Sequence, residues 1–133
     1  TDWPFRVLLP VGTHVPFHCT ASGKTYLASL PAAKRRTMLA GLDLHQYTET
    51  THTSTASLEQ ELKQVARDGY ALDREEFHEG MVAIAVPVFD SRRRYVAALA
   101  THGPKQRFNV EDAMTRRSLL VESAKIITET FGY

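Results

Sequence analysis

The segment from His18 to Thr25 contains the residue types that could bind a phosphate group. It reads HCTASGKT and matches the phosphate-loop pattern GxxxxGK[ST] at every position except the first, where His18 replaces glycine. That glycine normally provides a tight turn that a residue with a side chain resists. The chain is also short for the parallel sheet of such enzymes, and Pro87 interrupts the apolar run before Asp90 that could serve as the second nucleotide motif. The sequence therefore argues against nucleotide binding.

The same segment could still hold an anion through its backbone. Thr20 is a typical capping residue, and the small residues Ala21 and Ser22 open a predicted helix. The first amides of a helix have no acceptor within it and lie at its positive end, which favours a carboxylate or a phosphate. An ordinary capped helix without a ligand explains the same residues, so this segment alone leaves both interpretations open.

Histidine and cysteine show no pattern that is typical of a metal site or a catalytic centre. The six histidines lack zinc-type spacing, and Pro16 disfavours a helix that would join His14 and His18. Cys19 is adjacent to His18, but neighbouring side chains rarely point the same way, and there is no G-x-S-x-G motif. We expect no metal, no cofactor and no catalytic residue. A small enzyme that uses Cys19 or His102 is an alternative.

Asp73 ends a short predicted strand and is followed by Arg74 and two glutamates. The commoner role of such a carboxylate is a salt bridge at the surface. Asp73 could instead face a pocket and accept a hydrogen bond from a hydroxyl group of a ligand. The residues around it do not decide between these roles.

The overall composition fits one globular domain. The chain has 133 residues, of which 43% are hydrophobic and 23% charged, and its formal net charge is +1. Binding of bare nucleic acid usually needs a strong basic excess, and no apolar run approaches the ~18 residues of a membrane span. With a single cysteine, no internal disulfide can form, so we expect the reducing cytoplasm. The abrupt start without a signal peptide suggests a piece of a longer chain.

Hydrophobic periodicity predicts an α+β fold, an antiparallel sheet with helices packed beside it. Strands are expected at residues 5–9, 70–73, 81–89 and 95–101, the last two joined as a hairpin. Helices are expected at residues 20–29, 32–40, from a capping box at 57–60 to Gly69, and from Asn109 to the C-terminus. Residues 42–54 are polar and predict a long loop with at most one short strand. The strand at 81–89 is apolar throughout, which predicts cover on both faces.

Four stretches of the chain resemble the C-terminal effector-binding domain of IclR-type bacterial transcription regulators. They are PFHCTASGK at 16–24, DGYALDREE at 68–76, GMVAIAVPVFD at 80–90 and AALATHGP at 97–104, and their order and spacing also match. The resemblance covers nearly the whole chain. It implies a GAF-like antiparallel sheet flanked by helices, with residues 1–133 as the effector-binding domain. It also implies a winged helix-turn-helix DNA-binding domain on the N-terminal side, which this chain lacks.

The resemblance implies a ligand sensor rather than an enzyme. Family effectors are small metabolites, often carboxylates or aromatic compounds, and the regulators are dimers or tetramers that bind operator DNA through the winged helix. The effector would do no chemistry but would shift the population of two arrangements, acting for a repressor or an activator. An oligomerisation domain with a vestigial pocket is a further alternative.

The resemblance also carries ligand-binding positions onto this sequence. The floor of the ligand cup would be Val7, Val15 and Met81. The amides of Ala21 and Ser22 would hold the acidic end of the effector.

The remaining carried-over positions form the wall. Asp73 would meet a polar group, and Ala83, Ala100 and His102 complete the wall, where carboxylate sensors of the family can carry cysteine or serine. Methyl groups at two of these positions make the expected pocket roomier and more apolar, while His102 adds a titratable donor. We therefore expect an organic acid larger than a very small keto acid, including aromatic acids.

Overall fold

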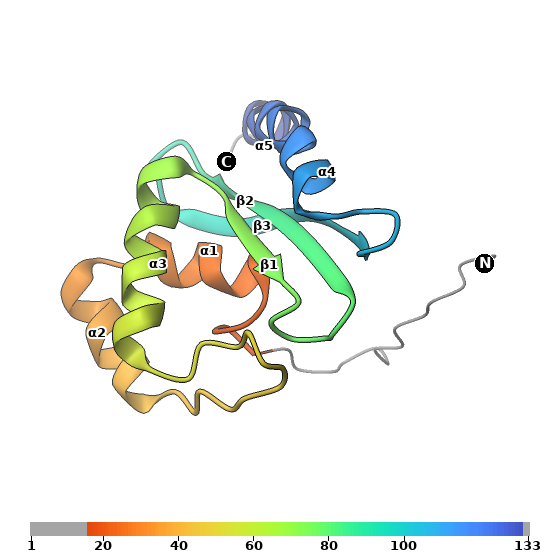
Figure 1. Cartoon of the computed structure of the whole chain (residues 1–133). Coiled ribbons are helices and arrows are strands. Elements are labelled where there is room, and N and C mark those ends of the chain that lie inside the picture. Colours follow the sequence, from red (N-terminus) through yellow and green to blue (C-terminus); the bar gives the residue numbers. More distant parts are fainter. Residues whose placement is uncertain (1–15, 132–133) are drawn as a thin grey trace.

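The computed structural model describes residues 16–131, which form a three-stranded antiparallel sheet between two groups of helices (Figure 1). The strands are β1 (Ala71–Arg74), β2 (Met81–Phe89) and β3 (Tyr95–Pro104), in that order across the sheet. The hairpin of β2 and β3 is the one expected from the sequence. The strand predicted at residues 5–9 lies outside the described residues. The α+β sheet with flanking helices is confirmed.

Five helices accompany the sheet within residues 16–131. They are α1 (Ala21–Ser29), α2 (Ala32–Gly41), α3 (Thr55–Asp68), α4 (Val110–Thr115) and α5 (Arg117–Phe131). The helices α1, α2 and α3 lie on one side of the sheet, and α4 and α5 on the other (Figure 1). None of the helices in this range is both long and apolar enough to cross a membrane.

Two predicted helix boundaries were wrong. The third helix is capped by Ser54, whose side chain accepts the amide of Ser57, so the capping box expected at 57–60 does not start it. The C-terminal helix is divided at Arg116, whose amide bonds to the carbonyl of Ala113 three residues earlier and tightens the turn there. The capping box at the start of α4 is present, with Asn109 and Asp112 exchanging hydrogen bonds.

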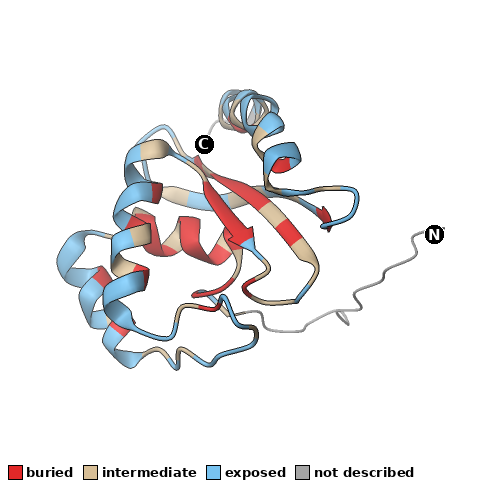
Figure 2. Cartoon of the chain, viewed as in Figure 1, coloured by how far each residue is buried: buried red, intermediate tan, exposed pale blue. Residues whose placement is uncertain are grey.

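The strand β2 separates two apolar cores, which accounts for its unbroken hydrophobic sequence. Its buried residues Val82, Ile84, Val86 and Val88 pack with residues of α4 and α5. The opposite face contacts α1, and Ala85 on that side is fully buried. Figure 2 shows β2 in the centre of the domain, with buried stretches separated by partly buried ones. The predicted cover on both faces is therefore confirmed.

Candidate functional site

A hollow of about 220 Å³ lies between the start of α1 and the face of the sheet that α1 covers. The strands and the helix start bring together residues that are far apart in the sequence. The predicted positions that line this hollow are Ala21, Ser22, Asp73, Met81, Ala83, Ala100 and His102. Val7 and Val15, the other two predicted positions, lie outside the described residues. The carried-over set thus converges on one cavity wherever the structure describes it.

The sequence did not single out four further residues of the lining. These are Thr20, Phe77, His78 and Val82. In the sequence Thr20 was interpreted only as a helix cap, and His78 was one of the histidines without a metal-site pattern. Both Phe77 and His78 lie in the turn between β1 and β2, four and five residues after Asp73, and this short separation in the sequence was the available signal.

The start of α1 is fixed by Thr20 and Gly23. The hydroxyl of Thr20 donates to the carbonyl of Pro16 at 2.8 Å and accepts the amide of Gly23 at 3.1 Å. A Cβ on Gly23 would lie 2.5 Å from the Cα of Phe17, so only glycine fits this close approach. Ala21 and Ser22 are the first two residues of α1, so their amides have no acceptor within the helix, and both residues line the hollow.

Lys24, the lysine of the phosphate-loop-like motif, bonds to groups inside the protein. Lys24 is fully buried, and its ammonium group donates to Glu61, to Glu76 and to the carbonyl of Leu72. It is not among the residues that line the hollow. Because its donors are committed to these partners, Lys24 does not act as the phosphate-binding lysine of a nucleotide site.

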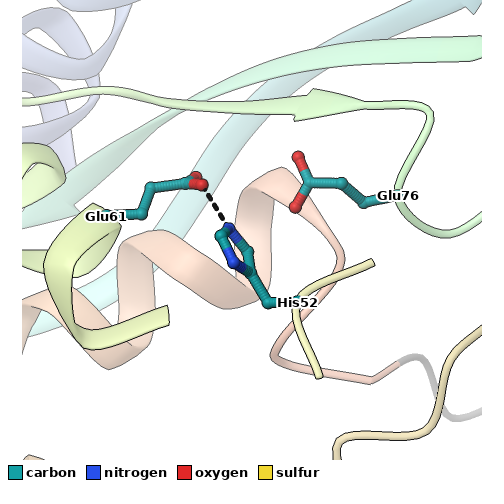
Figure 3. A group of neighbouring side chains, drawn as sticks. All are labelled: His52, Glu61 and Glu76. Atoms are coloured by element: carbon teal, nitrogen blue, oxygen red, sulfur yellow. Dashed lines mark hydrogen bonds and ion pairs between the residues drawn. The ribbon is translucent and has the colours of Figure 1, made fainter. Parts of the chain in front are cut away.

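His52, Glu61 and Glu76 lie close to one another (Figure 3), and the ammonium group of Lys24 contacts the two glutamates. The Nε2 atom of His52 lies 2.6 Å from a carboxylate oxygen of Glu61. Burial alone would raise the pKa of Glu61, but the hydrogen bond from His52 and the charge of Lys24 outweigh it and lower the pKa to about 2. The grouping resembles a set of metal ligands, yet the lysine already supplies the positive charge between the two glutamates.

A threonine-rich stretch holds the turn that follows Asp73. Within the predicted loop at 42–54, the hydroxyls of Thr48, Thr50 and Thr51 donate to backbone carbonyls of residues 74–76. Glu75 in this turn has a φ of 58°, an uncommon value for a residue with a side chain. The described residues of this loop form no strand. Its polar composition serves to brace the turn that places Asp73, Phe77 and His78 beside the hollow.

Asp73 is buried at the edge of the hollow and makes no ion pair among the described residues. One of its carboxylate oxygens accepts the amide of Glu76 at 2.8 Å. Burial raises the pKa of Asp73 to about 7, and the neighbouring Glu76 carboxylate adds to this against the opposing hydrogen bonds and Lys24. Of the two roles considered for Asp73, the structure supports the residue that faces a pocket.

Cys19 is fully buried and is not a nucleophile in this setting. Burial raises the pKa of its thiol to about 12, and the carboxylates of Asp73 and Glu76 add to the effect. The reactive thiolate is therefore not formed near neutral pH. The adjacent His18 bonds through Nε2 to the backbone carbonyl of His45 at 2.8 Å. An enzyme that uses Cys19 loses its chemical basis, and His102 lies exposed on β3 at the rim of the hollow.

Comparison with known proteins places these features in a family context. The family model described as "Bacterial transcriptional regulator IclR C-terminal" matches residues 2–129. The HTH-type transcriptional regulator KdgR of Escherichia coli is 36% identical over 128 residues, which cover 96% of this chain and 49% of that protein. The chain spans about half the length of the curated relatives it matches.

Solved structures share the architecture. The IclR protein of Thermotoga maritima superposes with a TM-score of 0.89 and 30% identity, covering 99% of this chain and 53% of that one. The inducer-binding domain of a PobR double mutant from Acinetobacter, solved as a complex with 3-hydroxybenzoic acid, gives a TM-score of 0.83 and 26% identity. That match covers 93% of this chain and 74% of the PobR domain.

Proposed function

The chain belongs to the family of C-terminal domains of IclR-type bacterial transcriptional regulators, and from this premise we propose that its hollow binds a small organic acid as the effector. The observation that carries the proposal is the composition of the hollow. Ala21 and Ser22, the first residues of α1, line one part of it, and the apolar residues Met81 and Ala83 of β2 line another. This combination suits a molecule with an anionic end and an apolar body.

The size of the hollow supports a metabolite rather than a nucleotide. Pockets for drug-sized ligands measure about 300–1,000 Å³, and this one measures about 220 Å³. The methyl groups of Ala83 and Ala100 leave room for a ring, and the PobR domain was solved with 3-hydroxybenzoic acid. We therefore propose a carboxylate with a compact apolar body, including aromatic acids.

The domain acts within a longer regulator in this proposal. Residues 1–133 form the effector-binding part, and a winged helix-turn-helix part binds operator DNA. The relatives KdgR and XynR are named HTH-type transcriptional regulators, which supports this division. The effector favours one arrangement of a dimer or tetramer in the cytoplasm and so changes the spacing of the DNA-binding parts. A coupling of ~1–3 kcal/mol changes operator affinity several-fold to a hundredfold.

Isothermal titration with pyruvate, benzoate and 3-hydroxybenzoate tests the proposal. We expect benzoate or 3-hydroxybenzoate to bind the chain, and binding of pyruvate alone would contradict the proposed size of the ligand. An oligomerisation domain with a vestigial pocket would bind none of them and show no thermal shift, whereas a ligand at 100 times its dissociation constant stabilises by ~2.7 kcal/mol.

Two substitutions of alanine by leucine on β3 test the location of the binding site. Ala100→Leu puts a larger side chain at the wall of the hollow and is expected to weaken binding by about tenfold or more, equivalent to about 1.4 kcal/mol. Ala97→Leu makes the same change at an exposed position on the same strand, outside the lining. Its affinity should stay close to that of the wild type. Equal weakening by both variants would contradict the location of the site.

A further inference from the structure

We propose that the hollow takes up its carboxylate ligand together with one proton, which Asp73 holds and donates as a hydrogen bond to an acceptor oxygen of that ligand. The inference rests on the proposed function and defines the ligand further. The bound acid presents a carboxylate or carbonyl oxygen to Asp73, so the hydrogen bond runs opposite to the direction expected from the sequence.

The first argument for a protonated Asp73 is the charge of the groups around it. The titratable groups near it are Lys24 from α1, Glu61 from α3, Glu76 and His78 from the β1–β2 turn, His102 from β3, Cys19 before α1, and His52, which bonds to Glu61. Lys24 is the only lysine or arginine in this group, and it contacts both glutamates. Lys24, Glu61 and Glu76 together carry one net negative charge before Asp73 ionises, and His52 offsets it only when protonated.

The second argument is the burial of Asp73 and its lack of a cationic partner. Asp73 is only 7% exposed, and its carboxylate accepts hydrogen bonds from backbone amides alone, that of Glu76 at 2.8 Å and that of Phe77, among the described residues. No cation of the hollow pairs with it. A buried carboxylate without a cation favours the neutral form, in agreement with its pKa of about 7.

The third argument is the proposed position of the ligand carboxylate beside Asp73. Asp73 and the amides at the start of α1 line the same hollow, and Asp73 is close enough to raise the pKa of Cys19, two residues before that helix. A ligand carboxylate held by those amides would place a further negative charge beside Asp73. Two like charges in an enclosed site do not both persist, so Asp73 takes a proton from solvent and becomes a donor.

Calorimetry in two buffers measures this proton directly. Titration of pyruvate, benzoate and 3-hydroxybenzoate into the chain at about pH 8, in HEPES and in Tris, gives the number of protons taken up from the difference in apparent enthalpy. We expect an uptake close to one proton for each acid that binds, because Asp73 is mostly ionised at that pH without ligand. Wild-type affinity should fall by about tenfold per pH unit above the pKa of Asp73.

Three variants assign the proton. In Asp73→Asn the uptake should vanish and the affinity should no longer depend on pH in this range, while His78→Gln and His102→Gln should retain the uptake. Binding of an acid by the wild type without proton uptake, or equal uptake by Asp73→Asn, would overturn the inference. If none of the three acids binds the wild type, the proposed function itself fails, which is a distinguishable result.

Discussion

Replacing Lys24 by methionine is expected to destabilise the domain by about 3–5 kcal/mol, because the change leaves the buried Glu76 and the half-buried Glu61 without their cation. The ammonium group is fully buried and bonds to Glu61, Glu76 and the carbonyl of Leu72. Domains of this kind have free energies of unfolding of about 5–15 kcal/mol, so the loss is a large fraction of the total. Urea unfolding followed by circular dichroism measures it as a lower midpoint.

Two control variants distinguish the loss of the cation that pairs with the glutamates from a general loss of positive charge. Lys63→Met removes a solvent-exposed lysine from α3 and should change stability by no more than about 0.5 kcal/mol. Combining Lys24→Met with Glu61→Gln and Glu76→Gln removes the unpaired charges and should recover part of the loss. A cost below about 1 kcal/mol for Lys24→Met alone would show that the buried network contributes little.

Asp73→Asn is expected to stabilise the domain at alkaline pH. The folded-state pKa of Asp73 is about 7, above the ordinary value of 3.8 for an aspartate, so the folded state binds this proton more tightly than the unfolded state. The cost of ionising the buried carboxyl is therefore absent below about pH 4, grows between about pH 4 and 7, and is complete above that range. One pH unit in pKa corresponds to about 1.4 kcal/mol, and we expect a gain of about 2–4 kcal/mol near pH 8.5.

Urea unfolding of both proteins across this pH range gives the required free energies. The gap between wild type and Asp73→Asn should widen as the pH rises and then level off. Asp43→Asn, which changes an exposed carboxylate, should alter stability by less than about 0.5 kcal/mol throughout. A gap for Asp73→Asn that is the same at every pH would contradict the assignment of the raised pKa.

A wild-type residue that makes the folded domain less stable than its replacement would points to a functional role. Asp73 is buried beside a cavity with no cationic partner from its lining, although asparagine would fit the same hydrogen bond from Glu76. Perturbed carboxyl groups of this kind are concentrated at binding and catalytic sites. The expected gain in stability for Asp73→Asn is thus the counterpart of its proposed role as a donor to the ligand.

Local sequence signals predicted most of the fold. Gly69 ends α3 with a φ of 80°, and Asn109 starts α4 through its capping box, both as expected from residue type and position. The boundary at Ser54 was missed because several serines and threonines nearby are equally good caps. The break at Arg116 was missed because apolar residues recur at helical spacing across it.

Long-range charge pairing could not be predicted from the sequence. Glu61 and Glu76 are separated from Lys24 by 37 and 52 residues, and no periodicity or motif connects them. The motif around Lys24 instead pointed to phosphate. The family resemblance predicted most of the residues that line the hollow. It did not predict Phe77 and His78, because their position depends on the turn that the threonines of residues 48–51 brace.

Amide NMR spectra of the nitrogen-15-labelled chain during titration with pyruvate, benzoate and 3-hydroxybenzoate test the central claim most directly. If the hollow binds an acid through the start of α1, the largest saturating shift changes will be those of Ala21, Ser22 and their neighbours, together with Asp73 and Ala83 across the cavity. Changes confined to α5 or to the outer surface, or no saturable change with any of the three acids, would contradict it.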